Sequence, residues 1–284
     1  MTFNNLFTVT SKEELLSRLE LILKYTIALC FIGHGFWGIV SKPEWVSLIT
    51  PLGFSKEFAL ASLPYIGWID VVLAVCIFAN NNKTWLWKAF LWTVFTALLR
   101  PIAGMSFFEV AERAGNWGPP LAFLLLAYAL CPKKKIFSKL SLSKPENFGR
   151  LTPELIDAVK LTLQISIGLL LIGHGGLVAI TQKSLYADHL AVLGITATSA
   201  VLSAYGFFEI ILGIVVALRP SRSLLWFVLV WKIFTESLFP FAGSLVDIFE
   251  TIERFGDFGA PIALILILSY LEHIKSSHLS RSYV

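Results

Sequence analysis

The sequence contains few charged residues for its length. Asp, Glu, Lys and Arg make up 15% of the 284 residues, whereas they make up about a quarter of an average soluble domain. Hydrophobic residues reach 56%, and the mean hydropathy is +0.73. Because so few polar groups cannot cover the surface of a soluble globule, the composition excludes a soluble protein, and a lipid bilayer is the expected partner and solvent.

Several functional motifs are missing as well. The cysteines Cys30, Cys76 and Cys131 form no CxxC pair, so their spacing predicts neither a dithiol redox site nor a metal site. No basic patch interleaved with aromatic residues is present, which excludes nucleic acid as a partner. The sequence also lacks flavin, nicotinamide and iron–sulfur motifs. Any electron carrier must therefore come from a partner or be a lipid-soluble quinone.

Eight stretches are long and apolar enough for a helix to cross the hydrocarbon core, which needs about 20 residues. They lie at about 21–40, 61–79, 84–104, 118–131, 160–180, 198–218, 222–242 and 258–272. The predicted domains are a cytoplasmic N-terminal segment (1–20), a first four-helix repeat (21–131), a basic cytoplasmic linker (132–154), a second four-helix repeat (155–272) and a cytoplasmic tail (273–284). The N-terminal segment is too polar and acidic for a signal peptide, and Ser11 with Glu14 predicts a capping box.

The two halves of the chain repeat one another. CFIGHGFWGIV matches LLIGHGGLVAI, and FEVAERAGNWGPPLA matches FETIERFGDFGAPIA. The alignment places His34 over His174, Asp70 over Glu209, Pro101 over Pro240, and Glu109, Glu112 and Arg113 over Glu250, Glu253 and Arg254, at separations of 139 to 141 residues. Several matches in one register indicate an internal duplication.

The repeat and the charges together predict a topology. Because each repeat has an even number of spans, both should enter the membrane in the same orientation, giving eight transmembrane helices as two parallel-oriented four-helix repeats. Lys and Arg concentrate in the linker and near both termini. Since basic residues favour the cytoplasmic side, both termini are predicted to be cytoplasmic.

Ionisable side chains inside the predicted spans are the candidate pocket residues. Such groups cost several kcal/mol in a bilayer unless they are paired or hydrated, and they commonly mark function. The candidates are His34, Asp70, Arg100, His174, Glu209, Lys232 and Glu236. Three roles stay open for the histidines: core side chains bonded to a neighbouring helix, groups that handle protons or contact a ligand, and joint ligands of a haem, which is the least favoured.

Three pairings are expected among these side chains. At 1.5 Å per residue, His34 and Asp70 lie within roughly 6 Å of the same membrane depth, which allows a His–carboxylate pair within each half. Lys232 and Glu236 are spaced i,i+4 and can neutralise each other on one helical face. Pairing of Arg100 with Glu236 across the interface between the halves is a further expectation.

An ExxER segment precedes the last span of each half. Its charged residues are Glu109, Glu112 and Arg113, with the copy Glu250, Glu253 and Arg254. The pattern predicts a solvated helix with salt bridges on the outer face of the membrane. The alternative is an acidic mouth above the polar interior, which would attract a cation or proton.

The Gly-His-Gly of the first span and the carboxylate of the second span resemble the DoxX-like family of small membrane proteins. In the second half, HGGLVAITQK and EIILGI, with Glu209 and Gly213, are similar to the family's motifs. The resemblance covers one four-helix unit; the duplication, Asp70 in place of Glu and the ExxER segment depart from it. It implies a four-helix bundle in the prokaryotic cytoplasmic membrane and a link to redox chemistry, since one member is a subunit of a thiosulfate:quinone oxidoreductase.

The leading functional hypothesis is a redox-associated or quinone-interacting membrane component that works with other membrane redox subunits. Its polar pocket would be lined by His34, Asp70, His174 and Glu209. A carrier for a small solute or proton is the first alternative, and a non-catalytic assembly or lipid-binding factor is the second. The sequence predicts no particular reaction.

Overall fold

The computed structural model describes residues 7–80, 82–133, 135, 138–139 and 141–282, and this part of the chain is helical without strands. Within it, eight helices have 15 or more residues. They are α2 (Lys12–Ile39), α4 (Lys56–Asn80), α5 (Lys83–Ile102), α7 (Ala114–Leu130), α9 (Pro153–Ala179), α11 (Ser199–Leu218), α12 (Arg222–Glu236) and α15 (Gly256–Ser282). Each of these helices overlaps one of the eight predicted stretches, although their bounds differ.

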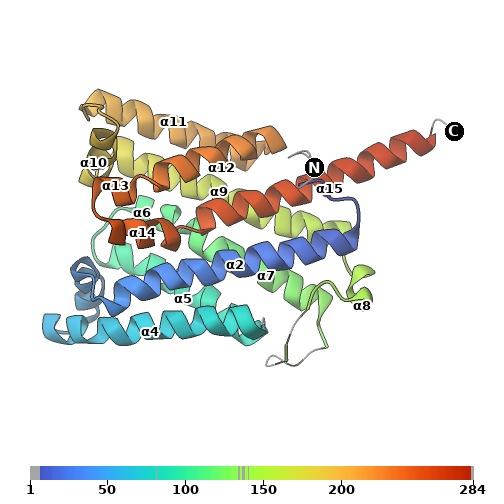
Figure 1. The fold of residues 1–284 in the computed structure, drawn as a ribbon, viewed down its shortest axis with the longest axis horizontal. Coiled ribbons are helices and arrows are strands. Elements are labelled where there is room, and N and C mark those ends of the chain that lie inside the picture. The colour runs from blue at the N-terminus through green and yellow to red at the C-terminus, as the bar shows by residue number, and fades with distance from the viewer. Residues whose placement is uncertain (1–6, 81, 134, 136–137, 140, 283–284) are drawn as a thin grey trace.

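The long helices lie side by side along the longest axis of the molecule (Figure 1). At one end gather the short elements η1 (Pro43–Trp45), α3 (Val46–Ile49), α6 (Phe107–Glu112), α10 (Ser184–Val192), α13 (Phe239–Ala242) and α14 (Ile248–Glu253). The start of α2, the end of α15 and α8 (Pro145–Phe148) lie toward the other end. The first and last long helices thus have their terminal ends on the same side.

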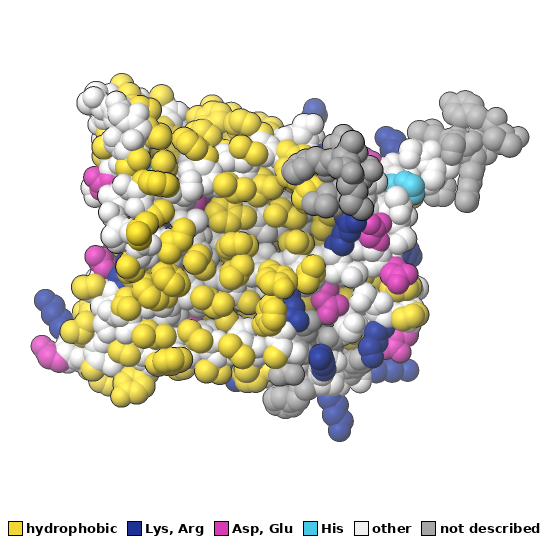
Figure 2. Space-filling view, in the orientation of Figure 1, with side chains coloured by type: hydrophobic (Ala, Val, Ile, Leu, Met, Phe, Trp, Pro, Cys, Tyr) yellow, Lys and Arg dark blue, Asp and Glu magenta, His cyan; other side chains and the backbone are white. Residues whose placement is uncertain are grey.

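Five helical segments are long and apolar enough to cross a membrane, which indicates a helical membrane protein. They are Lys56–Ala79, Pro153–Ala179, Ser199–Leu218, Arg222–Ala242 and Gly256–Ser277. Apolar side chains cover the middle of the face shown in Figure 2, and charged ones gather toward the ends, mainly the end with the termini. The other predicted spans correspond to α2, α5 and α7, of which α7 has 17 residues.

Helix ends differ from the prediction where local hydrogen bonds decide them. Helix α2 begins at Lys12, so the predicted N-terminal segment is partly continuous with the first span. Ser11 caps it by accepting a hydrogen bond from the Glu14 backbone, but the Glu14 carboxylate accepts from Thr10, so only half of the capping box forms. The described part of the predicted linker packs against the bundle, where Arg150 donates to the Leu130 carbonyl at 3.0 Å. Asn147 is buried and donates to the carbonyls of Ser141 and Leu142.

Glycines place the ExxER segments. Gly33 on α2 lies so close to the backbone of Glu253 that no Cβ would fit, and Gly173 on α9 meets Glu112 in the same way. Such close approach is typical of small residues at helix interfaces. Each ExxER helix therefore lies on the histidine helix of the opposite half: α14 on α2, and α6 on α9.

Candidate functional site

Charged side chains also pair across the two halves. Glu112 Oε1 lies 3.5 Å from His174 Nε2, and Glu253 Oε2 lies 4.0 Å from His34 Nε2. Two lysines follow the same rule, as Lys183 bonds Glu109 at 2.9 Å and Lys42 bonds Glu250. In each case a residue of the first half contacts a residue of the second half. The two histidine pairs occupy equivalent positions in the repeat, and so do the two lysine pairs. The site is therefore built at the interface between the halves.

His174 is enclosed by ionisable groups. Lys232 Nζ lies 3.0 Å from its Nδ1, 2.5 Å from Glu236 Oε1 and 3.4 Å from Asp257 Oδ2. Because an ammonium can only donate, Nδ1 accepts and a neutral His174 carries its proton on Nε2, which faces Glu112. The expected Lys232–Glu236 pair is present, and both side chains are buried.

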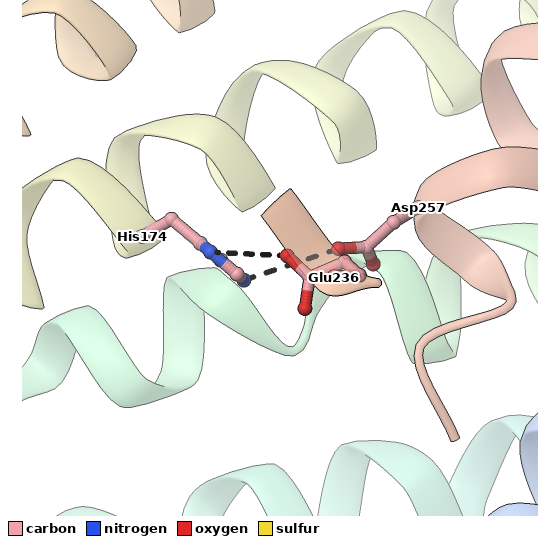
Figure 3. A group of neighbouring side chains, drawn as sticks. All are labelled: His174, Glu236 and Asp257. Carbon is pink, nitrogen blue, oxygen red and sulfur yellow. Dashed lines mark ion pairs between the residues drawn. The ribbon is translucent and has the colours of Figure 1, made fainter. Parts of the chain in front are cut away.

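This cluster has the donor atoms of a metal site but already contains a cation. One ligand atom each of His174, Glu236 and Asp257 lies within 4.8 Å of the others (Figure 3). The Lys232 ammonium contacts all three, so it supplies the positive charge that a metal ion would bring. Both nitrogens of His174 face charged side chains, so the arrangement offers none to a haem iron.

The corresponding region of the first half contains a cavity instead. In the repeat register Thr93 stands where the second half has Lys232, and Ala97 where it has Glu236. With these smaller side chains, space remains beside His34. It amounts to about 690 Å³, part of which is open to the surroundings. The lining residues are Cys30, Phe31, His34, Trp45, Leu48, Ile49, Leu63, Ile66, Asp70, Trp92, Thr93, Thr96, Leu99, Arg100 and Arg113. We call this space the His34 cavity.

Polar atoms in and beside the His34 cavity lack partners. Asp70 Oδ1, Arg113 Nε and Glu253 Oε2 are buried without a hydrogen bond among the described residues. His34 Nδ1 lies 2.9 Å from the Cys30 carbonyl oxygen, which can only accept, so a neutral His34 carries its proton on Nδ1. Its Nε2 then faces Glu253 Oε2 as a second acceptor, and a hydrogen-bond donor or a proton fits between them.

Exposure separates the two histidines. The His34 side chain is 20% exposed, whereas that of His174 is 3% exposed. Each histidine has an aromatic neighbour at the corresponding position. Between ring centroids, His34 lies 6.0 Å from Trp45, and His174 lies 6.2 Å from Tyr186. The two sites thus share a design, but the His34 side chain is the more exposed of the two.

Several predicted pairings are replaced by others. Within the described chain, His34 and His174 have their nearest carboxylates across the interface, and Glu209 instead accepts a hydrogen bond from Trp231 at 2.8 Å. Arg100 does not pair with Glu236. Its guanidinium donates to the Thr96 carbonyl at 2.7 Å, and its Nε lies 3.6 Å from the Glu109 carboxylate. Asp257 is not among the pocket residues that the sequence predicts. The repeat aligns it with Asn116, which is a further difference between the halves.

The ExxER segments are not a solvated helix or an open mouth. Glu112, Glu253 and Arg254 are buried at 6%, 2% and 7% exposure. Arg254 lies 3.1 Å from Glu253, 3.2 Å from Glu236 and 3.7 Å from Glu112. Burial alone would raise the pKa of Glu112, but Arg113, His174 and Arg254 hold that pKa well below its usual range. The segments form ion pairs that join the two histidine sites.

Comparison of the chain with protein-family models, curated proteins and solved structures gave no match. The resemblance to the DoxX-like family therefore rests on the short motifs of the first two spans of each half.

Acid is expected to remove the contribution of Glu253 to stability. Burial alone would raise the pKa of Glu253, but His34, Arg254 and Arg113 hold it well below its usual range. A carboxylate with a depressed folded pKa contributes its full stability above the unfolded pKa, about 4.3, and loses it as the pH falls through the folded pKa. The difference in Tm between wild type and Glu253→Gln should stay constant from about pH 7 to about pH 5 and shrink below about pH 4. Thermal unfolding in detergent measures it, and a difference that shrinks above about pH 5 would contradict this assignment.

Proposed function

We propose that the chain crosses the membrane eight times, as two four-helix units of the same orientation. The arrangement of α2, α5 and α7 beside the five long apolar segments supports this, as does the exchange of equivalent ion pairs between the halves. Both termini are proposed to be cytoplasmic, in the inner membrane of a prokaryote, as the basic linker and the DoxX-like motifs suggest. Reporter fusions at each terminus test the orientation, and a periplasmic signal from either would contradict it.

We further propose that the His34 cavity binds a lipid-soluble molecule of the quinone type. The cavity carries this proposal, because it combines apolar walls with a few convergent polar groups, as small-molecule sites do. Its walls include Phe31, Leu48 and Leu63, and its polar groups include Asp70 and Arg113. A quinone ring has a matching character, since it is apolar except for its oxygen atoms.

The polar residues of the cavity would bind different redox forms of the quinone. Arg113 Nε can donate a hydrogen bond to a carbonyl oxygen, whereas His34 Nε2 and Asp70 Oδ1 can accept one from a hydroxyl group. Both forms of a quinone would then find partners in one site. The sequence lacks flavin, nicotinamide and iron–sulfur motifs, so electrons would come from or go to a partner subunit.

Titration with a benzoquinone tests the proposal. Trp45 and Trp92 line the cavity, so a bound quinone should quench their fluorescence and saturate. Asp70→Asn should weaken the affinity roughly ten-fold, since it changes a buried group that contacts the ligand. The matched control is Glu209→Gln, because Glu209 occupies the same register position in the half where Lys232 lies beside the histidine, and this variant should leave the affinity unchanged. Quenching that does not saturate, or equal effects of both variants, would contradict the proposal.

A proton-coupled carrier is the second candidate. The ion pairs that run from His34 through Glu253, Arg254 and Glu112 to His174 favour it, because they join the two halves by titratable groups. Proteoliposomes distinguish the candidates. A carrier would move protons or solute without a quinone, and Glu112→Gln would abolish that flux. Wild-type protein that binds a quinone and shows no flux would exclude the carrier.

A further inference from the structure

An apolar groove runs along the outside of the first half, between α4 and α5. It is lined by Tyr65, Trp68, Ile69, Val72, Leu73, Trp85, Lys88, Leu91, Trp92 and Phe95. The lining side chains Trp68, Val72 and Leu91 are each more than half exposed, so the groove faces outward, where the surrounding lipid would lie. The space within it amounts to about 1610 Å³, part of which is open to the surroundings.

Trp92 connects this groove with the His34 cavity, because it lines both. On the cavity side, Trp92 lines the space together with Asp70. The cavity and the groove are therefore neighbouring compartments that share the Trp92 side chain. A molecule with its polar part in the cavity would therefore lie close to the outward-facing groove.

The second half closes the corresponding route with aromatic rings. Trp231, at the position of Trp92, lies 5.7 Å from Tyr205, 5.1 Å from Phe208 and 6.4 Å from Phe227 between ring centroids. Aromatic rings at these separations pack against one another. Tyr205, Phe208 and Phe227 align with Ile66, Ile69 and Lys88 of the first half. The first half therefore lacks the rings that fill this region in the second.

We propose that the ligand of the His34 cavity carries a hydrocarbon tail, enters sideways from the bilayer between α4 and α5, and leaves its tail in the groove. This inference rests on the proposed function, because it assigns the polar ring of the ligand to the cavity. The apolar lining of the groove matches a hydrocarbon chain, and Trp92, which lines both spaces, places such a chain beside the ligand of the cavity. The site is thus specific for long-tailed amphiphiles.

Two probes and two variants test this assignment in nanodiscs. The probes are a benzoquinone with a ten-carbon chain and the same ring without the chain. Leu91→Trp fills the groove at a side chain that is 56% exposed, so the helix can accept it. Val230→Trp is the matched control, because Val230 holds the same register position on α12 and is 62% exposed. Each variant is compared with wild type for the same probe, so partitioning of the probe into lipid cancels.

Leu91→Trp should weaken binding of the tailed probe roughly ten-fold by displacing its buried chain, and should leave the tailless probe within about two-fold of wild type. Val230→Trp should change neither affinity. Equal effects of Leu91→Trp on both probes, or no effect on the tailed one, would overturn the tail assignment while leaving the cavity as a binding site. If wild-type protein binds neither probe, the proposed function fails and this inference fails with it.

Discussion

Lys232→Met is expected to lower the free energy of unfolding by about 3–5 kcal/mol, the usual cost of breaking a buried ion pair by removing one partner. The Lys232 ammonium is fully buried and contacts Glu236, Asp257 and His174. Without it, two carboxylates would share a site of low polarity with much less positive charge nearby. Unfolding followed by circular dichroism in detergent measures the loss.

Thr93→Val is the matched control for Lys232→Met, because Thr93 holds the same register position in the first half and donates only within its own helix. We expect it to change stability by less than about 1 kcal/mol. The double variant Lys232→Thr with Glu236→Ala introduces the first-half residues and should regain part of the loss, since it removes a stranded charge together with its partner. A Lys232→Met protein as stable as wild type would show that this cluster is hydrated.

The reverse exchange, Thr93→Lys with Ala97→Glu, is expected to abolish ligand binding. It places the second half's ion pair in the His34 cavity, where Thr93 is part of the lining. The two longer side chains would occupy the space, and they can neutralise each other at i,i+4 as Lys232 and Glu236 do. Quinone titration by tryptophan quenching should then show no saturable component.

Two comparisons separate a filled cavity from a damaged fold. The double variant should keep the helical circular dichroism and the elution volume of wild type. Thr93→Leu, which fills less space and adds no charge, should weaken binding by a smaller factor. Wild-type affinity in the Thr93→Lys, Ala97→Glu protein would mean that the ligand binds elsewhere.

The fold could be predicted from composition and from the repeat. Stretches of about 20 apolar residues have few alternatives to helix in a bilayer; the described part of the chain is helical, and five of its helices are long and apolar enough to cross a membrane. Their ends were less predictable, because they depend on single hydrogen bonds such as that of Ser11 with the Glu14 backbone. The folding of the linker depends on a buried side chain, Asn147, whose sequence context is simply polar.

The partners in the site were harder to predict than its members. The position of each residue along its helix predicts that His34 and Asp70 lie at the same membrane depth, and both line one cavity. Depth carries no information about which face of a helix turns inward, so it did not show that Glu253 would face His34 from the other half. Gly33 and Gly173 permit this exchange by admitting a backbone at close range, which the sequence shows only as two small residues.

The His34 cavity depends on a difference between the halves rather than on a motif. Thr93 opposite Lys232 and Ala97 opposite Glu236 are visible in the alignment, but small residues leave a cavity only where their neighbours do not fill the space. Similarly, the sequence alone suggests that the charged side chains of the ExxER segments are exposed to solvent. Their burial becomes possible because Arg113 and Arg254 each meet carboxylates of both halves.

The number of quinone-type molecules bound per chain tests the account most directly. Titration of purified wild-type protein in nanodiscs, at concentrations well above the dissociation constant, gives this number from the break in the quenching curve. A single ligand per chain is predicted, because the half that contains Lys232 supplies its own cation and the half that contains Thr93 leaves a cavity. A value of two, or no saturation at all, would contradict the division of the protein into one open and one self-filled site.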